Sequence, residues 1–171
     1  MGKGQAPSST AMEFSAAASK HTVSDGDLSD VLQQLKQMPG PTVIIMRGLP
    51  GSGKSTAAGH IAELFDAEVH ATDSFFFKDG EYFFDPSKLK EFHALNQAAF
   101  QQSLEEGKAM VICDNTNTQR WEFEPYLAAA NQHGYQPIIV EIVADPEEAA
   151  ARCSHGVPLE AVRRMQARWE A

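Results

Sequence analysis

The sequence predicts an α/β fold in which a mostly parallel sheet lies between two layers of helices. Three observations lead to this prediction. Apolar runs at 42–46, 109–113 and 137–143 have the composition of buried parallel strands. Segments with apolar residues at helical spacing alternate with these runs, and the short connections imply right-handed crossovers that cover both faces of the sheet. The third observation is a glycine-rich segment after the first run.

This segment, residues 48–55, reads Gly-Leu-Pro-Gly-Ser-Gly-Lys-Ser and fits the phosphate-binding pattern Gly-x-x-x-x-Gly-Lys-Ser/Thr. Glycines let the backbone curl around phosphates, and the helix expected to begin near Gly53 adds free N–H groups and the positive end of its dipole. We expect Lys54 to reach the β- and γ-phosphates of ATP and Ser55 to ligate Mg²⁺. The expected nucleotide-binding residues are Gly48, Pro50, Gly51, Ser52, Gly53, Lys54, Ser55 and Thr56. The predicted fold is therefore a P-loop NTPase, a three-layer α/β/α sandwich.

Length and composition favour one domain with a tail. The chain has 171 residues, of which 43% are hydrophobic. Residues 1–24 are rich in Ala, Ser and Gly, a composition that cannot offset its ordering entropy, so we expect a disordered tail there. Residues 25–171 are the expected P-loop domain, which includes a short amphipathic helix at 27–38.

Charge and hydropathy limit the possible partners. The net charge of −9 argues against a large contact surface for duplex nucleic acid, but it leaves room for a short nucleic-acid end held in a local pocket. No apolar run approaches the roughly 18 residues that span a bilayer, so we expect no membrane contact. The only two cysteines, Cys113 and Cys153, lie far apart, which indicates a reduced compartment, and we expect a cytoplasmic protein. The sequence indicates no protein partner.

Two aspartates follow expected strands at the edge of the sheet where ligands bind. Asp73 ends the run 67–73, and there it could accept a proton from an acceptor hydroxyl or cap the following turn. Asp114 begins the segment 114–117 after another strand, where many P-loop enzymes hold a carboxylate for Mg²⁺ and its waters. A hydrogen-bonding turn is the alternative for 114–117, particularly for Asn115 and Asn117. We expect Asp73 as general base and Asp114 with Ser55 at the metal.

The C-terminal third predicts a helical lid. Arg152 lies in the helix after the last strand, and a lid arginine can neutralise charge on a transferred phosphoryl group. We favour Arg152 over Arg163 and Arg164. The aromatic loop 74–84 could stack on a base or sugar, although half or more of its aromatic residues are expected to pack in the core or lid. The expected catalytic residues are thus Lys54, Asp73 and Arg152.

Several of these segments together resemble the P-loop kinase domain of the Nedd-type ubiquitin-ligase-binding protein 2-like group, which is related to phage polynucleotide kinase. The resemblance extends from Thr42 to about Glu170 and leaves the first 40 residues unexplained. The segments that carry it are 48–56, Thr72-Asp73 with 75–77, 114–117, Trp121-Glu122 with Pro125-Tyr126, Arg152 with 155–157, and 157–165.

The resemblance implies transfer of the ATP γ-phosphoryl group to the 5′-hydroxyl of a polynucleotide, with Asp73 as base and Arg152 in the lid. Two departures affect acceptor choice. Phe76 stands where the phage enzyme has an arginine that holds the acceptor's phosphate, and the second lid arginine has no clear equivalent, although His155 stands nearby.

The sequence therefore predicts a P-loop kinase that uses Mg²⁺ and ATP and acts on a hydroxyl acceptor, with the 5′ end of a polynucleotide as the first choice. A small-molecule kinase for a nucleoside, a sugar or a similar alcohol is the first alternative. An ATP-dependent switch or binding module that transfers nothing to an acceptor is the second. The identity of the acceptor, the oligomeric state and the role of the tail stay open.

Overall fold

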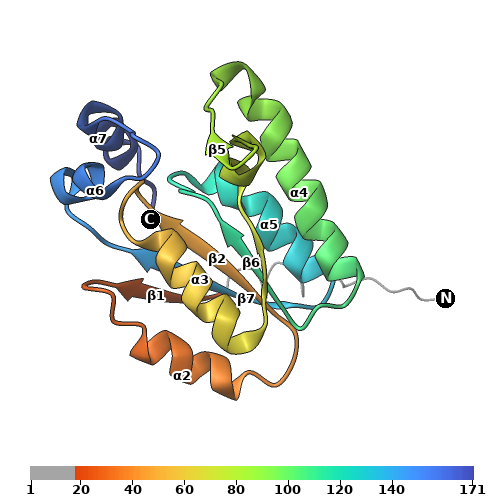
Figure 1. Cartoon of the computed structure of the whole chain (residues 1–171). Helices are drawn as coiled ribbons and strands as arrows, with labels where there is room; N and C mark the ends of the chain where they lie inside the picture. The colour runs from red at the N-terminus through yellow and green to blue at the C-terminus, as the bar shows by residue number, and fades with distance from the viewer. Residues whose placement is uncertain (1–17) are drawn as a thin grey trace.

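A computed structural model describes residues 18–171, and it contains a five-stranded sheet in which every pairing is parallel (Figure 1). The strand order is β1-β7-β2-β6-β3, so β2, which leads into the glycine-rich segment, is central. The strands are β1 (Ser19–Val23), β2 (Thr42–Gly48), β3 (Glu68–His70), β6 (Met110–Asp114) and β7 (Gln136–Ile142).

Helices cover both faces of the sheet, as the continuous apolar strands require. One face packs against α2 (Ser29–Gln37) and α3 (Lys54–Phe65). The opposite face packs against α4 (Leu89–Glu105) and α5 (Arg120–Gln132). Successive residues of β2 alternate between the two cores: Ile44 and Met46 belong to the first, and Val43 and Ile45 to the second. The three-layer α/β/α prediction is confirmed.

Two further units lie at the carboxyl edge of the sheet. Helices α6 (Pro146–Arg152) and α7 (Leu159–Ala167) follow β7 and lie beyond the strand ends (Figure 1). They share a small core of Ala149 and Val162 with Leu49 of the glycine-rich segment. Between β3 and α4 the chain forms two 3₁₀ helices, η1 (Thr72–Phe76) and η2 (Pro86–Lys88), and a hairpin of β4 (Phe77–Lys78) and β5 (Glu81–Tyr82).

The predicted tail at 1–24 is wrong in its last part. Residues 19–23 form β1, which pairs with β7 in register from Ser19 opposite Ile138 to Val23 opposite Ile142. Val23 is only 3% exposed, so the strand contributes to the core. Residues 1–17 lie outside the described part of the chain. The expected helix at 27–38 is α2, and its buried Val31 and Leu35 face the sheet.

Candidate active site

The segment between β2 and α3 curls around the first turn of α3. Gly51 and Gly53 have φ angles of +80° and +97°, a region that L side chains rarely adopt. Space is also limiting at Gly51, where a Cβ atom would lie 1.8 Å from the carbonyl oxygen of Ala149 in α6. No side chain caps the N-terminus of α3, so its first N–H groups are left for an anion.

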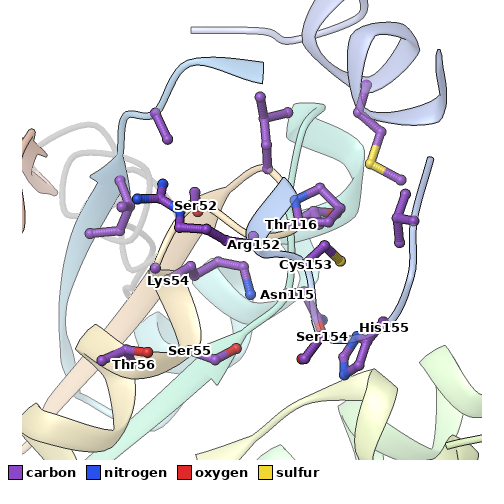
Figure 2. Close-up of a pocket in the computed structure, with 18 of the residues that line it drawn as sticks. Ser52, Lys54, Ser55, Thr56, Asn115, Thr116, Arg152, Cys153, Ser154 and His155 are labelled. Carbon is purple, nitrogen blue, oxygen red and sulfur yellow. The ribbon is translucent and has the colours of Figure 1, made fainter. Parts of the chain in front are cut away.

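The buried polar groups of this loop fit a phosphate. The Ser52 hydroxyl is buried and has no hydrogen-bond partner among the described residues, which is costly unless a ligand supplies one. Lys54 is also buried, and its Nζ atom lies in the same cleft as the Ser55 and Thr56 side chains (Figure 2). An orphaned hydroxyl, free N–H groups and one ammonium are the donors that a polyphosphate needs.

Lys54 forms an ion pair with Asp114. Its Nζ atom lies 2.7 Å from Asp114 Oδ1, and both side chains are at most 10% exposed. Asp114 is the last residue of β6 and pairs in register with Met46 of β2, which places the carboxylate beneath the phosphate loop. The pair joins the expected phosphate-binding cation to the expected metal-binding carboxylate.

The residues present fit Mg²⁺ better than a metal bound by protein alone. Within the described range 18–171, no three histidine, cysteine or acidic side chains gather closely enough to hold an ion. Mg²⁺ in kinases is commonly held by one or two protein oxygens together with substrate phosphates. Ser55 and Asp114 offer a hydroxyl and a carboxylate beside the phosphate loop.

The turn after β6 has a structural role. Asn115 Oδ1 accepts a hydrogen bond of 2.9 Å from the Thr72 N–H, and Asn117 Nδ2 donates one of 2.8 Å to the Met46 carbonyl. The first bond ties the end of β6 to the residue before Asp73. For these two asparagines the structure has the hydrogen-bonding turn that was the alternative to a role at the metal.

Asp73 lies beyond the end of its strand, whereas the sequence predicted it as the last residue of that strand. β3 ends at His70, and Asp73 belongs to η1, because the chain turns into a 3₁₀ helix at Thr72. Its carboxylate is half exposed and contacts two side chains instead of capping the helix. Tyr82 OH donates to Asp73 Oδ1 at 3.4 Å, and His155 Nδ1 lies 3.4 Å from Oδ2.

Tyr82 and His155 form a small aromatic stack beside Asp73. Their rings are 4.0 Å apart at an angle of 10°. Burial and the nearby Asp73 carboxylate raise the pKa of Tyr82, so its hydroxyl stays protonated and can donate. These two residues were not among the predicted site residues. They come from β5 and from the segment after α6, so no local sequence pattern links them to Asp73.

Arg152 lines the same cleft, at the C-terminal end of α6. The side chain of Arg152, at the end of α6, and that of His155, in the segment after it, point in different directions (Figure 2). Arg163 instead pairs with Glu147 at 2.9 Å, away from the cleft. Of the three arginines considered for the lid, Arg152 is the one that the fold brings to the cleft.

Phe76 is a core residue. It is 3% exposed and packs against Phe92, Phe84 and Tyr82, with ring centroids 4.6 to 6.1 Å apart. Phe77, Phe83 and Phe84 are each about half exposed. The loop therefore divides into a packed part and an exposed part, as expected.

Arg47 is a structural residue that the sequence reasoning did not single out. It is 1% exposed, forms an ion pair of 2.7 Å with Glu141, and lies between the rings of Phe123 and Trp169. It also donates to the carbonyls of residues 117, 118 and 170. The sequence signal was an arginine that directly follows an apolar run, because a buried arginine must have a charged or polar partner.

Together these elements enclose one cleft of about 1660 Å³ that contains the phosphate loop, Asp73 and Arg152. Residues 43–171 match the AAA_33 family, described as an AAA domain. The chain belongs to this family. The AAA_33 domain here has a P-loop, kinase-like fold, as its sheet order, phosphate loop and solved neighbours agree. Every helix in the described part of the chain is too short or too polar to cross a bilayer.

The AAA_33 chain is similar to human NEDD4-binding protein 2, with 36% identity over 152 residues that cover 86% of this chain. The match covers 9% of that relative, and the chain spans about a tenth of the length of the first curated relatives that it matches. The predicted resemblance to this group is confirmed.

Three solved structures share the fold. The first is the Pnkp1/Rnl/Hen1 RNA repair complex, with a TM-score of 0.62 and 19% identity, covering 75% of this chain and 44% of that one. The second is Chaetomium thermophilum Kti12 with ADP-AlF3, with a TM-score of 0.58, 16% identity and coverages of 75% and 80%. The third is a gluconokinase from Sinorhizobium meliloti 1021, with a TM-score of 0.56, 15% identity and 78% coverage of both chains.

Proposed function

We propose that this chain is an ATP-dependent kinase that transfers the γ-phosphoryl group to the 5′-hydroxyl of a polynucleotide. The observation that carries the proposal is that Lys54 and Asp73, a phosphate-binding cation and an accessible carboxylate, line one cleft. A phosphate-bearing donor and a hydroxyl acceptor need such groups on the two sides of the transferred group.

In the proposed reaction, an acceptor oxygen attacks the γ-phosphorus of ATP and the bond to the β-phosphate oxygen breaks. ADP leaves, and the proton of the acceptor hydroxyl passes to an oxygen of Asp73. Tyr82 and His155 hold this carboxylate on two sides and so fix its direction.

Lys54 and Arg152 supply positive charge to the oxygens of the transferred group. Ser55 and Asp114 would hold Mg²⁺, which would supply further positive charge to the phosphates. Most of the rate enhancement comes from positioning and electrostatics, since phosphoryl transfer needs little covalent chemistry from the protein.

The polynucleotide acceptor rests on the similarity to NEDD4-binding protein 2 and to the structure of an RNA repair complex that contains Pnkp1. A small-molecule acceptor is the second candidate, because this chain has a buried Phe76 where the phage enzyme has an arginine that holds the acceptor's phosphate. The wall of the cleft around Asp73 includes the uncharged side chains of Tyr82, Phe84 and Leu89, which suit an acceptor that carries no phosphate there.

An acceptor screen tests the proposal. Purified protein with γ-labelled ATP and Mg²⁺ is given a 5′-hydroxyl oligonucleotide, the same oligonucleotide with a 5′-phosphate as control, and a panel of nucleosides and sugars. Label on the 5′-hydroxyl oligonucleotide alone supports the proposal. Label on a nucleoside or sugar alone would select the small-molecule kinase. If no acceptor takes label or speeds ADP release, the chain is a nucleotide-dependent switch.

A further inference from the structure

The turn between β1 and α2 opens into the same cleft as the phosphate loop. Val23, Ser24, Asp25, Gly26 and Leu28 all line that cleft. One strand, β7, separates β1 from β2, and neighbouring strands are about 4.8 Å apart, so the turn lies about 10 Å from the strand that leads into the phosphate loop. Figure 1 shows it at the same end of the sheet as α6 and the start of α3.

The cleft wall near this turn is largely apolar. Val23 and Leu28 are buried, and Ile142 and Ala144 continue the wall from the end of β7. A hydrogen bond of 2.8 Å from the Val143 N–H to the Val23 carbonyl holds the two segments together. An apolar wall with few polar groups is typical of the part of a ligand site that receives a flat, neutral group.

Asp25 is the acidic side chain of this turn that lines the cleft; it is exposed to solvent, and the backbone that carries it is held in place. A hydrogen bond of 3.2 Å from the Asp27 N–H to the Ser24 carbonyl closes the turn, and Asp25 and Gly26 have φ angles of +55° and +71°. Neighbouring aspartates are occupied: Asp27 accepts from Ser29, and Asp145 caps α6. Among the described residues, Asp25 takes part in none of the side-chain hydrogen bonds or ion pairs that hold the fold together.

We propose that this turn is the nucleobase site of the cleft and that the Asp25 carboxylate accepts a hydrogen bond from the 6-amino group of adenine. The inference rests on the proposed use of ATP. A carboxylate repels phosphates, so it belongs at the end of the cleft away from the phosphate loop, where the neutral base lies. Val23 and Ile142, at the ends of β1 and β7, form the apolar wall beside the base. The strand that the sequence placed in a tail thereby becomes part of the nucleotide site.

Binding of nucleoside diphosphates tests the inference without any acceptor or turnover. Calorimetry with Mg²⁺ compares ADP with purine riboside 5′-diphosphate, which differs only by lacking the 6-amino group. A hydrogen bond to a charged acceptor gives about tenfold or more in affinity, so the unaltered chain binds ADP about tenfold more tightly. Asp25→Ala should bind the two ligands equally, with an affinity weaker than that of the unaltered chain for ADP.

Asp66→Ala is the matched control. Asp66 has a φ angle of +54°, nearly that of Asp25, but it lies at the C-terminal end of α3 outside the cleft. This variant carries the same backbone strain and keeps the tenfold preference for ADP.

Equal affinity of the unaltered chain for the two diphosphates, an undiminished preference in Asp25→Ala, or tighter binding of GDP than of ADP would each overturn the base assignment while the phosphate site stands. If ADP does not bind at all, the proposed kinase function fails together with the base site.

Discussion

Two buried cations flank the phosphate loop, and each is paired with one carboxylate. Arg47 at the end of β2 pairs with Glu141, and Lys54 at the start of α3 pairs with Asp114. Arg47 is enclosed by two aromatic rings and three carbonyls, so it fixes the fold. Lys54 has its one partner at the floor of an open cleft, so it can also serve a ligand.

The Lys54 pair predicts a non-additive effect on stability. Lys54→Met leaves the Asp114 carboxylate buried without a partner, and we expect the free energy of unfolding to fall by about 3 kcal/mol. Lys54→Met/Asp114→Leu removes both charges and should be more stable than the single variant. Urea unfolding monitored by circular dichroism measures both. A double variant less stable than Lys54→Met would contradict the buried pair.

The sequence predicted those site residues whose positions follow from local order. The glycine pattern after a strand is enough to place Lys54 and Ser55, and the end of an apolar run is enough to place Asp114. The contacts of His155 and Tyr82 with Asp73 could not be predicted, because they depend on how the segment after α6 folds back across the hairpin of β4 and β5. The partners of Arg47 could not be predicted either, because they are distant from it in the sequence.

At the scale of elements, the phosphate loop and α6 are built against each other. The Ala149 carbonyl occupies the space beside Gly51 where a side chain would otherwise lie. Any side chain at position 51 must therefore move α6, and with it Arg152, away from the loop.

Gly51→Ala should lower the melting temperature by several degrees and weaken ADP binding at least tenfold, because it combines a steric clash with a positive φ angle. Gly59→Ala is the control. Gly59 lies inside α3, where an added Cβ would meet no atom within 4 Å and the φ angle is not positive, so the change should stabilise the helix by about 0.5–1 kcal/mol. Differential scanning calorimetry and ADP titration measure both. Tight ADP binding by Gly51→Ala would show that the contact with α6 is dispensable.

Strand β1 could not be predicted from its sequence. Its five residues, Ser-Lys-His-Thr-Val, are mostly polar and short, with no sustained apolar pattern. They are extended because they pair with the edge of β7 that would otherwise be free, and within β1 only Val23 is buried. The apolar strands β2, β6 and β7 had a clear signal by comparison, since both of their faces are covered.

A pair of truncations tests the corrected boundary. A chain that begins at Ala18 keeps β1, whereas a chain that begins at Ser24 lacks it and exposes the edge of β7. Loss of the buried Val23 side chain alone costs about 2 kcal/mol, so the shorter chain should melt about 5 °C lower. Equal melting temperatures would mean that β1 adds nothing to stability.

At the scale of the whole molecule, two half-buried histidines link stability to pH. His70 lies 2.7 Å from the Ser103 hydroxyl and His93 lies 3.0 Å from that of Thr72. Burial lowers the pKa of both imidazoles below the ordinary value of 6.5. The unfolded chain therefore takes up protons at a higher pH than the folded chain does.

The sign of the effect follows from that difference. Above pH 6.5 both histidines are neutral in the folded and the unfolded chain, and the free energy of unfolding is at its full value. It falls as the pH drops from 6.5 toward their lowered pKa values, because the unfolded chain is protonated first. The free energy of unfolding should therefore decline as the pH falls below about 6.5. His70→Asn/His93→Gln should make this decline shallower, and the exposed His133→Gln should not. An unchanged slope in the double variant would exclude these two histidines as its source.

In the proposed reaction the two sides of the cleft have different roles: the phosphate loop binds ATP, and Asp73 takes the proton of the acceptor. Rapid-quench single-turnover transfer from γ-labelled ATP, measured beside ATP affinity, tests it most directly with the acceptor found in the screen. Lys54→Ala should lose transfer and bind ATP more weakly. Asp73→Asn should bind ATP as the unaltered chain does and transfer at least a hundredfold more slowly, since general-base catalysis contributes about that much. An Asp73→Asn chain that transfers at the normal rate would contradict the claim.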